Sequence, residues 1–245
     1  MRKKIISTNQ LTSVLTPDIL VKFPGTSNLS KLSPADFEMM FGVKYQPELL
    51  IEPAARAYIS KEAKIYEKLN TNLNLLEKFG KQLDEGYIGP VYLSRTKNMG
   101  WGLFASEIIN SGELIGEYTG LVREQRKEDN LNRYLLDYHP LDHECLAQKK
   151  DCPLNNYSID AQNVGNYLRF LNHSSKNANA GYFYVSYKEA FHVIFVASRK
   201  IRKNEQIFFN YGFMYWASLR SLGIVPVERG VKNKVSRALS SLGFY

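Results

Sequence analysis

The hydrophobic period of this sequence changes at Gly89-Pro90, and this change limits the folds that the chain can adopt. Before it, apolar residues recur every three or four positions, which is the spacing of one helix face. After it, short runs of β-branched and aromatic residues alternate with turn residues, which is typical of short strands. These runs lie at 91–93, 103–105, 114–118, 182–185 and 191–196. The predicted fold class is therefore mainly β (α+β), preceded by a helical region over 1–88.

The helical region contains a short helix and a longer one. Ser33 is a predicted N-cap, followed by Pro34 at the first helical position and Asp36 at the third, and Gly42 closes this short helix. A longer helix is expected over about 54–83, where apolar residues form one narrow stripe. The stripe consists of Tyr58, Ile65, Leu69, Leu73, Leu76, Phe79 and Leu83. It fits either a helix packed on its own domain or a homodimer seam through 54–83, and the pattern does not decide between them.

Composition narrows the class of protein. With 44% hydrophobic and 23% charged residues in 245, the chain has the composition of a soluble globular protein. No apolar run approaches the roughly 18 residues of a membrane span, and residues 1–7 lack the apolar core of a secretory signal. We therefore expect no membrane association and a cytoplasmic location in the producing cell. The net charge of +8 is spread along the chain without a nucleic-acid-reading motif, so direct nucleic-acid binding is not favoured.

A cluster of His139, His143, Cys145 and Cys152 falls within 14 residues and has the ligand chemistry of zinc. Its spacing does not follow a common zinc finger, and residues 137–151 read as a solvated insertion. We therefore expect no metal. Two cysteines in the whole chain are also too few for a disulfide framework.

The functional signal lies in four blocks. Two are the run 166–174, Asn-Tyr-Leu-Arg-Phe-Leu-Asn-His-Ser, and the run 205–212, Glu-Gln-Ile-Phe-Phe-Asn-Tyr-Gly. The other two contain glycines and lie at 95–105 and 112–120. A lone Gly-x-Gly usually marks only a tight turn, where the missing side chain lets the backbone approach a neighbour. In this order, the four blocks resemble those of the SET-domain protein-lysine methyltransferases.

The resemblance implies a fold, a cofactor and a set of binding residues. The fold would be a SET domain over 89–216, built of short sheets with a C-terminal pseudoknot and followed by a helical tail over 217–245. The cofactor would be S-adenosyl-L-methionine. Residues that match the family's cofactor-binding positions are Arg95, Gly100, Trp101, Gly102, Tyr134, Arg169, Phe170, Asn172 and His173. In this assignment Asn172 and the His173 backbone contact the adenine and ammonium ends of the cofactor, and Arg169 braces the site.

The same resemblance makes Tyr211 the catalytic residue, with Tyr118 and Phe209 as walls of a lysine channel and Asp137 near the peptide groove. A free lysine amine has a pKa of about 10.4, so at neutral pH it is protonated and cannot attack. No general base stands out in these blocks, so burial in an apolar aromatic channel and a nearby sulfonium charge must lower the amine pKa. The Tyr211 hydroxyl would then orient the neutral amine. Phe209, in a position where a tyrosine can hold a water, favours di- or trimethyl-lysine.

Some positions depart from the family pattern. Asn210 replaces the acid that usually precedes the catalytic tyrosine, and the run after His173 lacks the family's Cys and Pro. No Cys-x-Cys-x4-Cys run follows Tyr211, so the pockets must be closed by other residues. The candidates for this are Phe213, Tyr215 and Trp216.

The compact chain without cysteine-rich modules resembles the bacterial SET proteins of host-associated microbes. This implies a protein substrate with an exposed lysine, either a histone or a basic bacterial chromatin protein. It also implies that a bacterial chain could be secreted into a host cell and act in the nucleus. The alternative is a catalytically weak SET-like module that binds partners, which cofactor binding without turnover would support.

Overall fold

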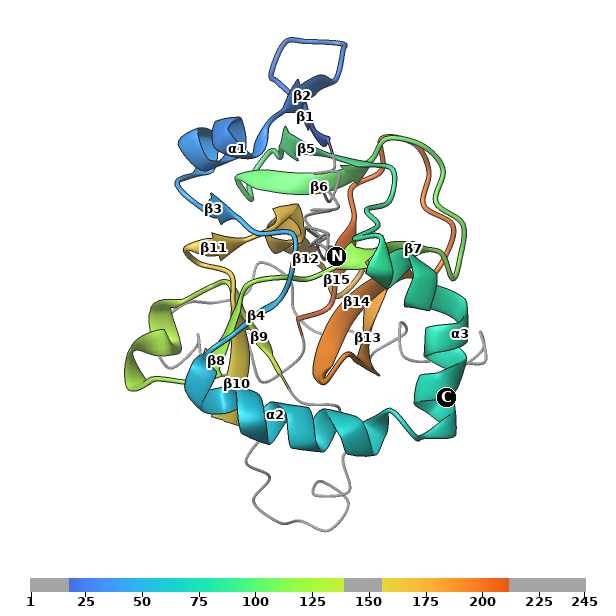
Figure 1. The fold of residues 1–245 in the computed structure, drawn as a ribbon. Coiled ribbons are helices and arrows are strands. Elements are labelled where there is room, and N and C mark those ends of the chain that lie inside the picture. The colour runs from blue at the N-terminus through green and yellow to red at the C-terminus, as the bar shows by residue number, and fades with distance from the viewer. Residues whose placement is uncertain (1–17, 139–155, 212–245) are drawn as a thin grey trace, which may run out of the picture.

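The structure is a computed structural model that describes residues 18–138 and 156–211 (Figure 1). In these ranges the strands form two four-stranded sheets, one three-stranded sheet and two two-stranded pairs. The helices α1–α3 lie at the outside of this assembly (Figure 1). The expected mainly β fold of short sheets is therefore confirmed.

The first four-stranded sheet contains strands from both sides of Gly89-Pro90, where the hydrophobic period of the sequence changes. Its order is β2 (Ser30–Leu32), β1 (Ile19–Lys22), β5 (Val91–Arg95) and β6 (Trp101–Ala105), and β1 runs parallel to β5. Two more strands from before Gly89 join later ones: β3 (Lys44–Tyr45) pairs with β11 (Val164–Gly165), and β4 (Leu50–Ile51) pairs with β8 (Leu121–Glu124). The expected helical region thus also supplies four strands, which sequence analysis missed because strands of two to four residues are too short to show a period.

The remaining sheets contain the functional blocks. One has the order β4, β8, β10 (Tyr157–Asp160) and β9 (Leu135–Asp137), and another the order β13 (Ala180–Tyr187), β14 (Ala190–Ala197) and β7 (Leu114–Glu117). The pair β12 (Asn172–His173) and β15 (Phe208–Phe209) is parallel, with Asn172 opposite Phe208 and His173 opposite Phe209. This pairing joins the two sequence-distant blocks, which is the contact that the expected pseudoknot requires.

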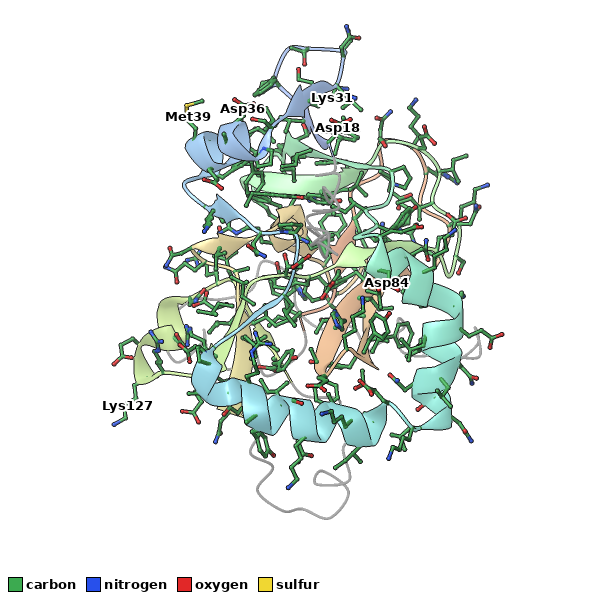
Figure 2. The ribbon with its side chains drawn as sticks, viewed as in Figure 1. Asp18, Lys31, Asp36, Met39, Asp84 and Lys127 are labelled. Atoms are coloured by element: carbon green, nitrogen blue, oxygen red, sulfur yellow. The ribbon has the colours of Figure 1, made fainter. Side chains whose placement is uncertain are left out.

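The short helix α1 (Pro34–Phe41) begins and ends where the sequence predicts. The Ser33 hydroxyl accepts a hydrogen bond from the Asp36 backbone, and the Asp36 carboxylate accepts one from the Ser33 backbone. At the other end Gly42 adopts a φ of +65°, which glycine reaches without a side-chain clash. Met39 projects from this helix with 81% of its surface exposed (Figure 2).

The single helix expected over 54–83 is wrong, because the chain turns at 67–69 between α2 (Pro53–Tyr66) and α3 (Asn70–Asp84). No glycine or proline marks this turn, so the sequence could not reveal it. Both helices pack against the β13–β14 pair of their own chain (Figure 1). Their buried apolar residues are Ala55, Ile59, Ala63, Leu75 and Phe79. Of the stripe, Phe79 is buried, Tyr58, Leu76 and Leu83 are partly buried against the core, and Ile65, Leu69 and Leu73 stay exposed. Packing within one chain therefore explains only part of the stripe, and the fold does not test the homodimer seam.

The core positions the site by joining the sheets around one large apolar cluster, and a smaller cluster lies under α3. The smaller one unites Phe79 with Leu114, Phe183 and Ile194, so α3 covers one face of the β13–β14–β7 sheet. None of the helices within the described ranges has the length and apolar character needed to cross a membrane.

Candidate active site

The cofactor residues predicted on β6 and β12 are neighbours in the structure. The Asn172 side-chain amide donates a hydrogen bond of 3.0 Å to the carbonyl oxygen of Trp101. The Trp101 ring lies under the exposed Arg95 guanidinium, 4.7 Å from its Cζ to the ring centroid, which is a cation–π contact. The edge-on ring of Phe41, in α1, lies 5.3 Å from it. Phe41 is not among the predicted site residues, because nothing local in a helix indicates which distant strand it meets.

The two glycines of the Gly-x-Gly, Gly100 and Gly102, are favoured at their positions for different physical reasons. Gly100 has a φ of +69°, and an added Cβ there would meet no atom within 4 Å. An added Cβ at Gly102 would lie 2.6 Å from Gln206 Nε2 and 2.9 Å from Asn172 Nδ2. Gly102 therefore makes room for the ends of three side chains, the third being Thr96 Cγ2 at 2.7 Å, whereas Gly100 is favoured by its positive φ.

A buried side-chain donor lies at the same place. Gln206 Nε2 finds no hydrogen-bond partner among the described residues, although it is shielded from solvent. A buried amide without a partner is unfavourable by about 1–3 kcal/mol, so a bound acceptor would offset that cost. The Asn172 amide lies beside the same glycine and bonds the Trp101 backbone, and the Trp101 ring carries the Arg95 cation. These groups fit a cofactor that carries a flat purine and a zwitterionic tail, as S-adenosyl-L-methionine does.

Arg169 is a buried cation held between two aromatic rings. Its Cζ lies 3.7 Å from the Tyr134 ring centroid and 5.0 Å from that of Phe170, and its Nε donates to the Ala161 carbonyl oxygen at 2.8 Å. Burial lowers the pKa of this guanidinium, but arginine remains charged in proteins. The Phe170 ring also packs 4.7 Å from that of Phe41, so its place is in the core beside the cofactor residues.

Tyr211 lies against the end of the first block. Its hydroxyl donates a 2.5 Å hydrogen bond to the Leu171 carbonyl oxygen, and its backbone N–H donates to His173 Nδ1 at 3.1 Å. The ring centroid lies 4.5 Å from that of Phe209 and 5.2 Å from that of His173. Because the hydroxyl proton points at Leu171, the oxygen lone pairs are the groups that can accept an amine N–H.

An aromatic cluster surrounds Phe209. Its ring lies 4.9 Å from Phe195 and 6.3 Å from Tyr182, and Phe195 lies 6.3 Å from Tyr118. The Tyr118 hydroxyl donates to the Tyr134 carbonyl oxygen at 3.1 Å, which links this cluster to the cofactor residues. Phe195 and Tyr182 are not among the predicted site residues, because the alternating pattern of a strand does not reveal which ring faces which.

Asp137 is further from the centre. It is exposed on β9, and its carbonyl oxygen accepts a 2.6 Å hydrogen bond from the Tyr184 hydroxyl. Tyr184 in turn contacts Tyr182, with ring centroids 5.8 Å apart. Tyr184 and Tyr182 thus connect Asp137 to Phe209, and the role of Asp137 in the peptide groove stays a prediction.

Comparison with known proteins identifies the region that holds these residues. Residues 100–212 match the family described as the SET domain. The chain carries a SET domain. A solved structure of ATXR5 in complex with histone H3.1 has a TM-score of 0.55 and 18% identity, over 73% of this chain and 86% of that one, which shows a shared fold.

Two curated proteins are similar in sequence. The histone-lysine N-methyltransferase Su(var)3-9 of Drosophila melanogaster is 31% identical over 56% of this chain and 21% of its own length. The H3 lysine-9 specific enzyme of Schizosaccharomyces pombe is 24% identical over 96% of this chain and 48% of its own length. The chain therefore spans less than half the length of these relatives.

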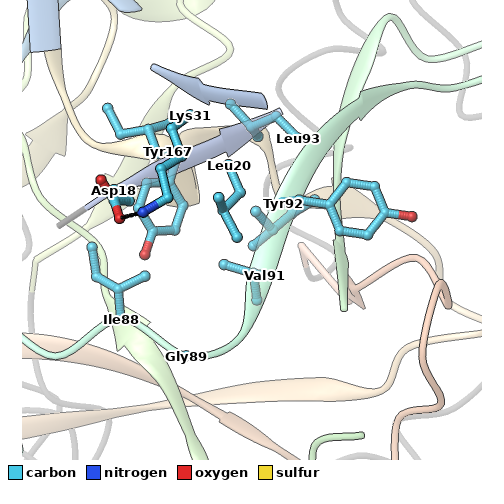
Figure 3. A pocket seen from close by; sticks show the side chains of 11 residues that line it. Asp18, Leu20, Lys31, Ile88, Gly89, Val91, Tyr92, Leu93 and Tyr167 are labelled. Atoms are coloured by element: carbon cyan, nitrogen blue, oxygen red, sulfur yellow. Dashed lines mark hydrogen bonds and ion pairs between the residues drawn. The ribbon is translucent and has the colours of Figure 1, made fainter. Parts of the chain in front are cut away.

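A cavity is lined by residues other than those predicted to bind cofactor or lysine. It has a volume of about 410 Å³ and is bounded by β1, β2, β5 and Tyr167 (Figure 3). Lys31 and Asp18 form an ion pair at its wall. None of the residues predicted to bind cofactor or lysine lines it. The predicted pocket-closing residues Phe213, Tyr215 and Trp216, the tail over 217–245, and the cluster from His139 to Cys152 lie outside the described residues.

Proposed function

We propose that this chain is a protein-lysine N-methyltransferase that uses S-adenosyl-L-methionine. The observation that carries the proposal is the β12–β15 pairing, which sets Tyr211 against Leu171 beside an aromatic cluster. The same strand β12 carries Asn172, whose amide holds the Trp101 backbone. One strand pair therefore supports both a cofactor cluster and a lysine cluster, which methyl transfer requires to be adjacent.

The residues assigned to the cofactor divide by chemistry. When bound, S-adenosyl-L-methionine supplies a methyl group on a cationic sulfonium. Trp101 and Arg95 would cover the purine, and the amides of Asn172 and Gln206 would bond its polar groups. Arg169 would hold the Tyr134 ring in place, since its guanidinium is stacked on that ring.

The aromatic cluster would prepare the lysine. The buried rings of Phe209 and Tyr118 exclude water, and desolvation lowers the pKa of a lysine amine because it disfavours the charged form. The Tyr211 oxygen would then accept an N–H of the neutral amine and aim its lone pair. Positioning of this kind supplies about 7–11 kcal/mol of a barrier in favourable cases.

The substrate and the product state are also proposals. The named relatives are histone-lysine methyltransferases, which supports a histone or another basic DNA-packaging protein as substrate. Phe209 lacks a hydroxyl that could hold a water beside the amine, which supports transfer to di- or trimethyl-lysine.

The test is methyl transfer from labelled S-adenosyl-L-methionine to a panel of histones and basic bacterial proteins, with mass spectrometry of the products. Tyr211→Phe keeps the ring but removes the hydroxyl, so turnover should fall at least 10-fold, or about 1.4 kcal/mol of transition-state stabilisation. Cofactor affinity by calorimetry should change little.

Tyr92→Phe is the matched control, since it deletes a hydroxyl that bonds Asn204 outside the site. Its turnover should equal that of the wild type. Cofactor binding without methylation of any protein in the panel would instead favour the partner-binding alternative. Full activity of Tyr211→Phe on a verified substrate would reject the assigned mechanism.

A further inference from the structure

A buried arginine lies behind the site and has all of its donors satisfied. Arg123, on β8, is 4% exposed. Its guanidinium donates to Asp160 Oδ2 from Nε and Nη2 at 2.9 and 2.7 Å, and to both oxygens of Asp129 at 2.8 and 2.6 Å. A fifth hydrogen bond of 2.8 Å goes to the Glu124 carbonyl oxygen. A buried charge with this complete set of partners has one fixed geometry.

The second carboxylate oxygen of Asp160 continues the hydrogen-bond network toward Tyr134. Asp160 Oδ1 accepts a 2.9 Å hydrogen bond from the Asn132 side-chain amide. Asn132 Oδ1 then accepts the backbone N–H of Tyr134, also at 2.9 Å, in a turn closed by its own side chain. Within residues 18–138 and 156–211, the Asn132 side chain therefore links the buried ion pair to the Tyr134 N–H by hydrogen bonds.

Tyr134 belongs to both parts of the site. Its ring is the face on which the Arg169 guanidinium stacks at 3.7 Å, and its carbonyl oxygen accepts the Tyr118 hydroxyl. The chain that leads to it has little burial of its own, because residues 124–128 are exposed and η1 (Lys127–Leu131) is a short 3₁₀ helix. Two backbone contacts of Tyr134 fix its place: its carbonyl oxygen accepts the Ala161 N–H at 3.1 Å, beside the β9–β10 pairing, and its N–H is held by the Asn132 side chain.

We infer that Asn132 is a positioning residue, which transfers the fixed geometry of the Arg123–Asp160 pair to Tyr134 and so aligns the cofactor and lysine clusters. This inference rests on the proposed function for its effect on cofactor binding. Its structural part, the placement of Tyr134, does not depend on that function.

Asn132→Ala is the informative variant. It removes the connection but leaves the Arg123–Asp160–Asp129 ion pairs intact, whereas a change at Arg123 leaves buried carboxylates unpaired and threatens folding. We expect the dissociation constant for S-adenosyl-L-methionine, measured by calorimetry, to rise at least 5-fold. Amide hydrogen exchange of Tyr134 should accelerate at least 10-fold, while exchange in β13 and β14 stays unchanged.

Arg133→Ala is the matched control, because Arg133 is the exposed neighbour of Asn132. It should leave both measurements at wild-type values. Unchanged cofactor affinity in Asn132→Ala, with wild-type protein that binds the cofactor, would overturn the inference.

The same experiment distinguishes a failure of the proposed function from a failure of the positioning role of Asn132. If wild-type protein does not bind S-adenosyl-L-methionine, the proposed function fails, and hydrogen exchange alone decides the positioning role. Faster exchange at Tyr134 in Asn132→Ala would then still support it, and unchanged exchange would reject it. A loss of protection across β13 and β14 as well would reject it in favour of general destabilisation.

Discussion

The Phe209 side chain is 8% exposed and enclosed by the rings of Tyr211, Phe195 and Tyr182. In so tight a setting one added oxygen atom changes the space beside the lysine amine. We predict that Phe209→Tyr retains activity but shifts the product toward monomethyl-lysine, because the new hydroxyl can hold a water in the space of an added methyl group. Mass spectrometry of the product distribution measures this.

Phe208→Tyr, at the neighbouring position on β15, is the control and should leave the distribution unchanged. An unaltered share of di- and trimethyl-lysine in Phe209→Tyr would contradict the proposed role of that ring.

His192, on β14, is a titratable residue whose protonation affects the stability of the fold. Its Nδ1 lies 2.8 Å from Glu117 Oε1, and its Nε2 lies 3.1 Å from the Tyr187 carbonyl oxygen. Burial by itself lowers the pKa of His192, but the Glu117 carboxylate and the Tyr187 carbonyl oxygen together outweigh it and raise the pKa above its ordinary value of 6.5. Lys188 opposes this increase to a smaller extent. The protonated pair thus stabilises the folded state.

The sign of the pH dependence follows. Because the folded pKa is the higher one, the stabilisation is fully present below about pH 6.5 and is lost as the pH rises through the folded pKa. We predict that His192→Gln lowers the free energy of unfolding most at acidic pH, and that the difference from wild type shrinks toward alkaline pH. Urea unfolding from pH 5 to pH 9 measures it, and parallel pH profiles would contradict it.

At the scale of elements, the Asn72 side chain attaches α3 to the β13–β14 hairpin. It forms the two hydrogen bonds that the backbone of a neighbouring strand would form. Asn72 is 5% exposed, and its amide bonds both backbone groups of Ser186, donating to the carbonyl oxygen at 2.9 Å and accepting the N–H at 2.7 Å. The Ser186 hydroxyl also donates to the Ala63 carbonyl oxygen in α2. One position on β13 therefore joins both helices.

We predict that Asn72→Ala lowers the free energy of unfolding by at least about 2 kcal/mol, because two buried backbone groups lose their partner. Asn74→Ala, two positions along the same helix but exposed, should change it by less than about 0.5 kcal/mol. Urea denaturation compares the two variants. Equal stability of both would show that the Asn72 bonds contribute nothing net.

At the scale of the whole molecule, α2 and α3 bury the apolar side chains of Ala55, Ile59, Ala63, Leu75 and Phe79 against their own chain. Ile65, Leu69 and Leu73 remain 54%, 43% and 49% exposed. A stable protein–protein interface uses about 20–30 residues on each side, far more than these three. We predict that light scattering gives the monomer mass. A dimer mass that Leu73→Glu converts to a monomer would contradict this prediction.

Features that depend on neighbours in the chain could be predicted from the sequence. The capping residues of α1, the strands around Leu103 and Phe191, and the blocks that contain Asn172 and Tyr211 all have local signals. These signals are turn chemistry, an alternating period and fixed motif spacing, and each is complete within a few residues. The family and its candidate site residues followed from them.

Features that depend on residues far apart in the chain were decided by the tertiary structure alone. The turn between α2 and α3 has no local breaker. The strands β1, β3 and β4 pair with strands that come later in the chain, and β2 pairs with β1. Phe41 at Trp101, Phe195 at Phe209, and Asn132 between Asp160 and Tyr134 are likewise contacts across long separations. The sequence by itself determined which chemical groups are present, and packing decided which of them meet, because a local pattern does not specify the partner on another element.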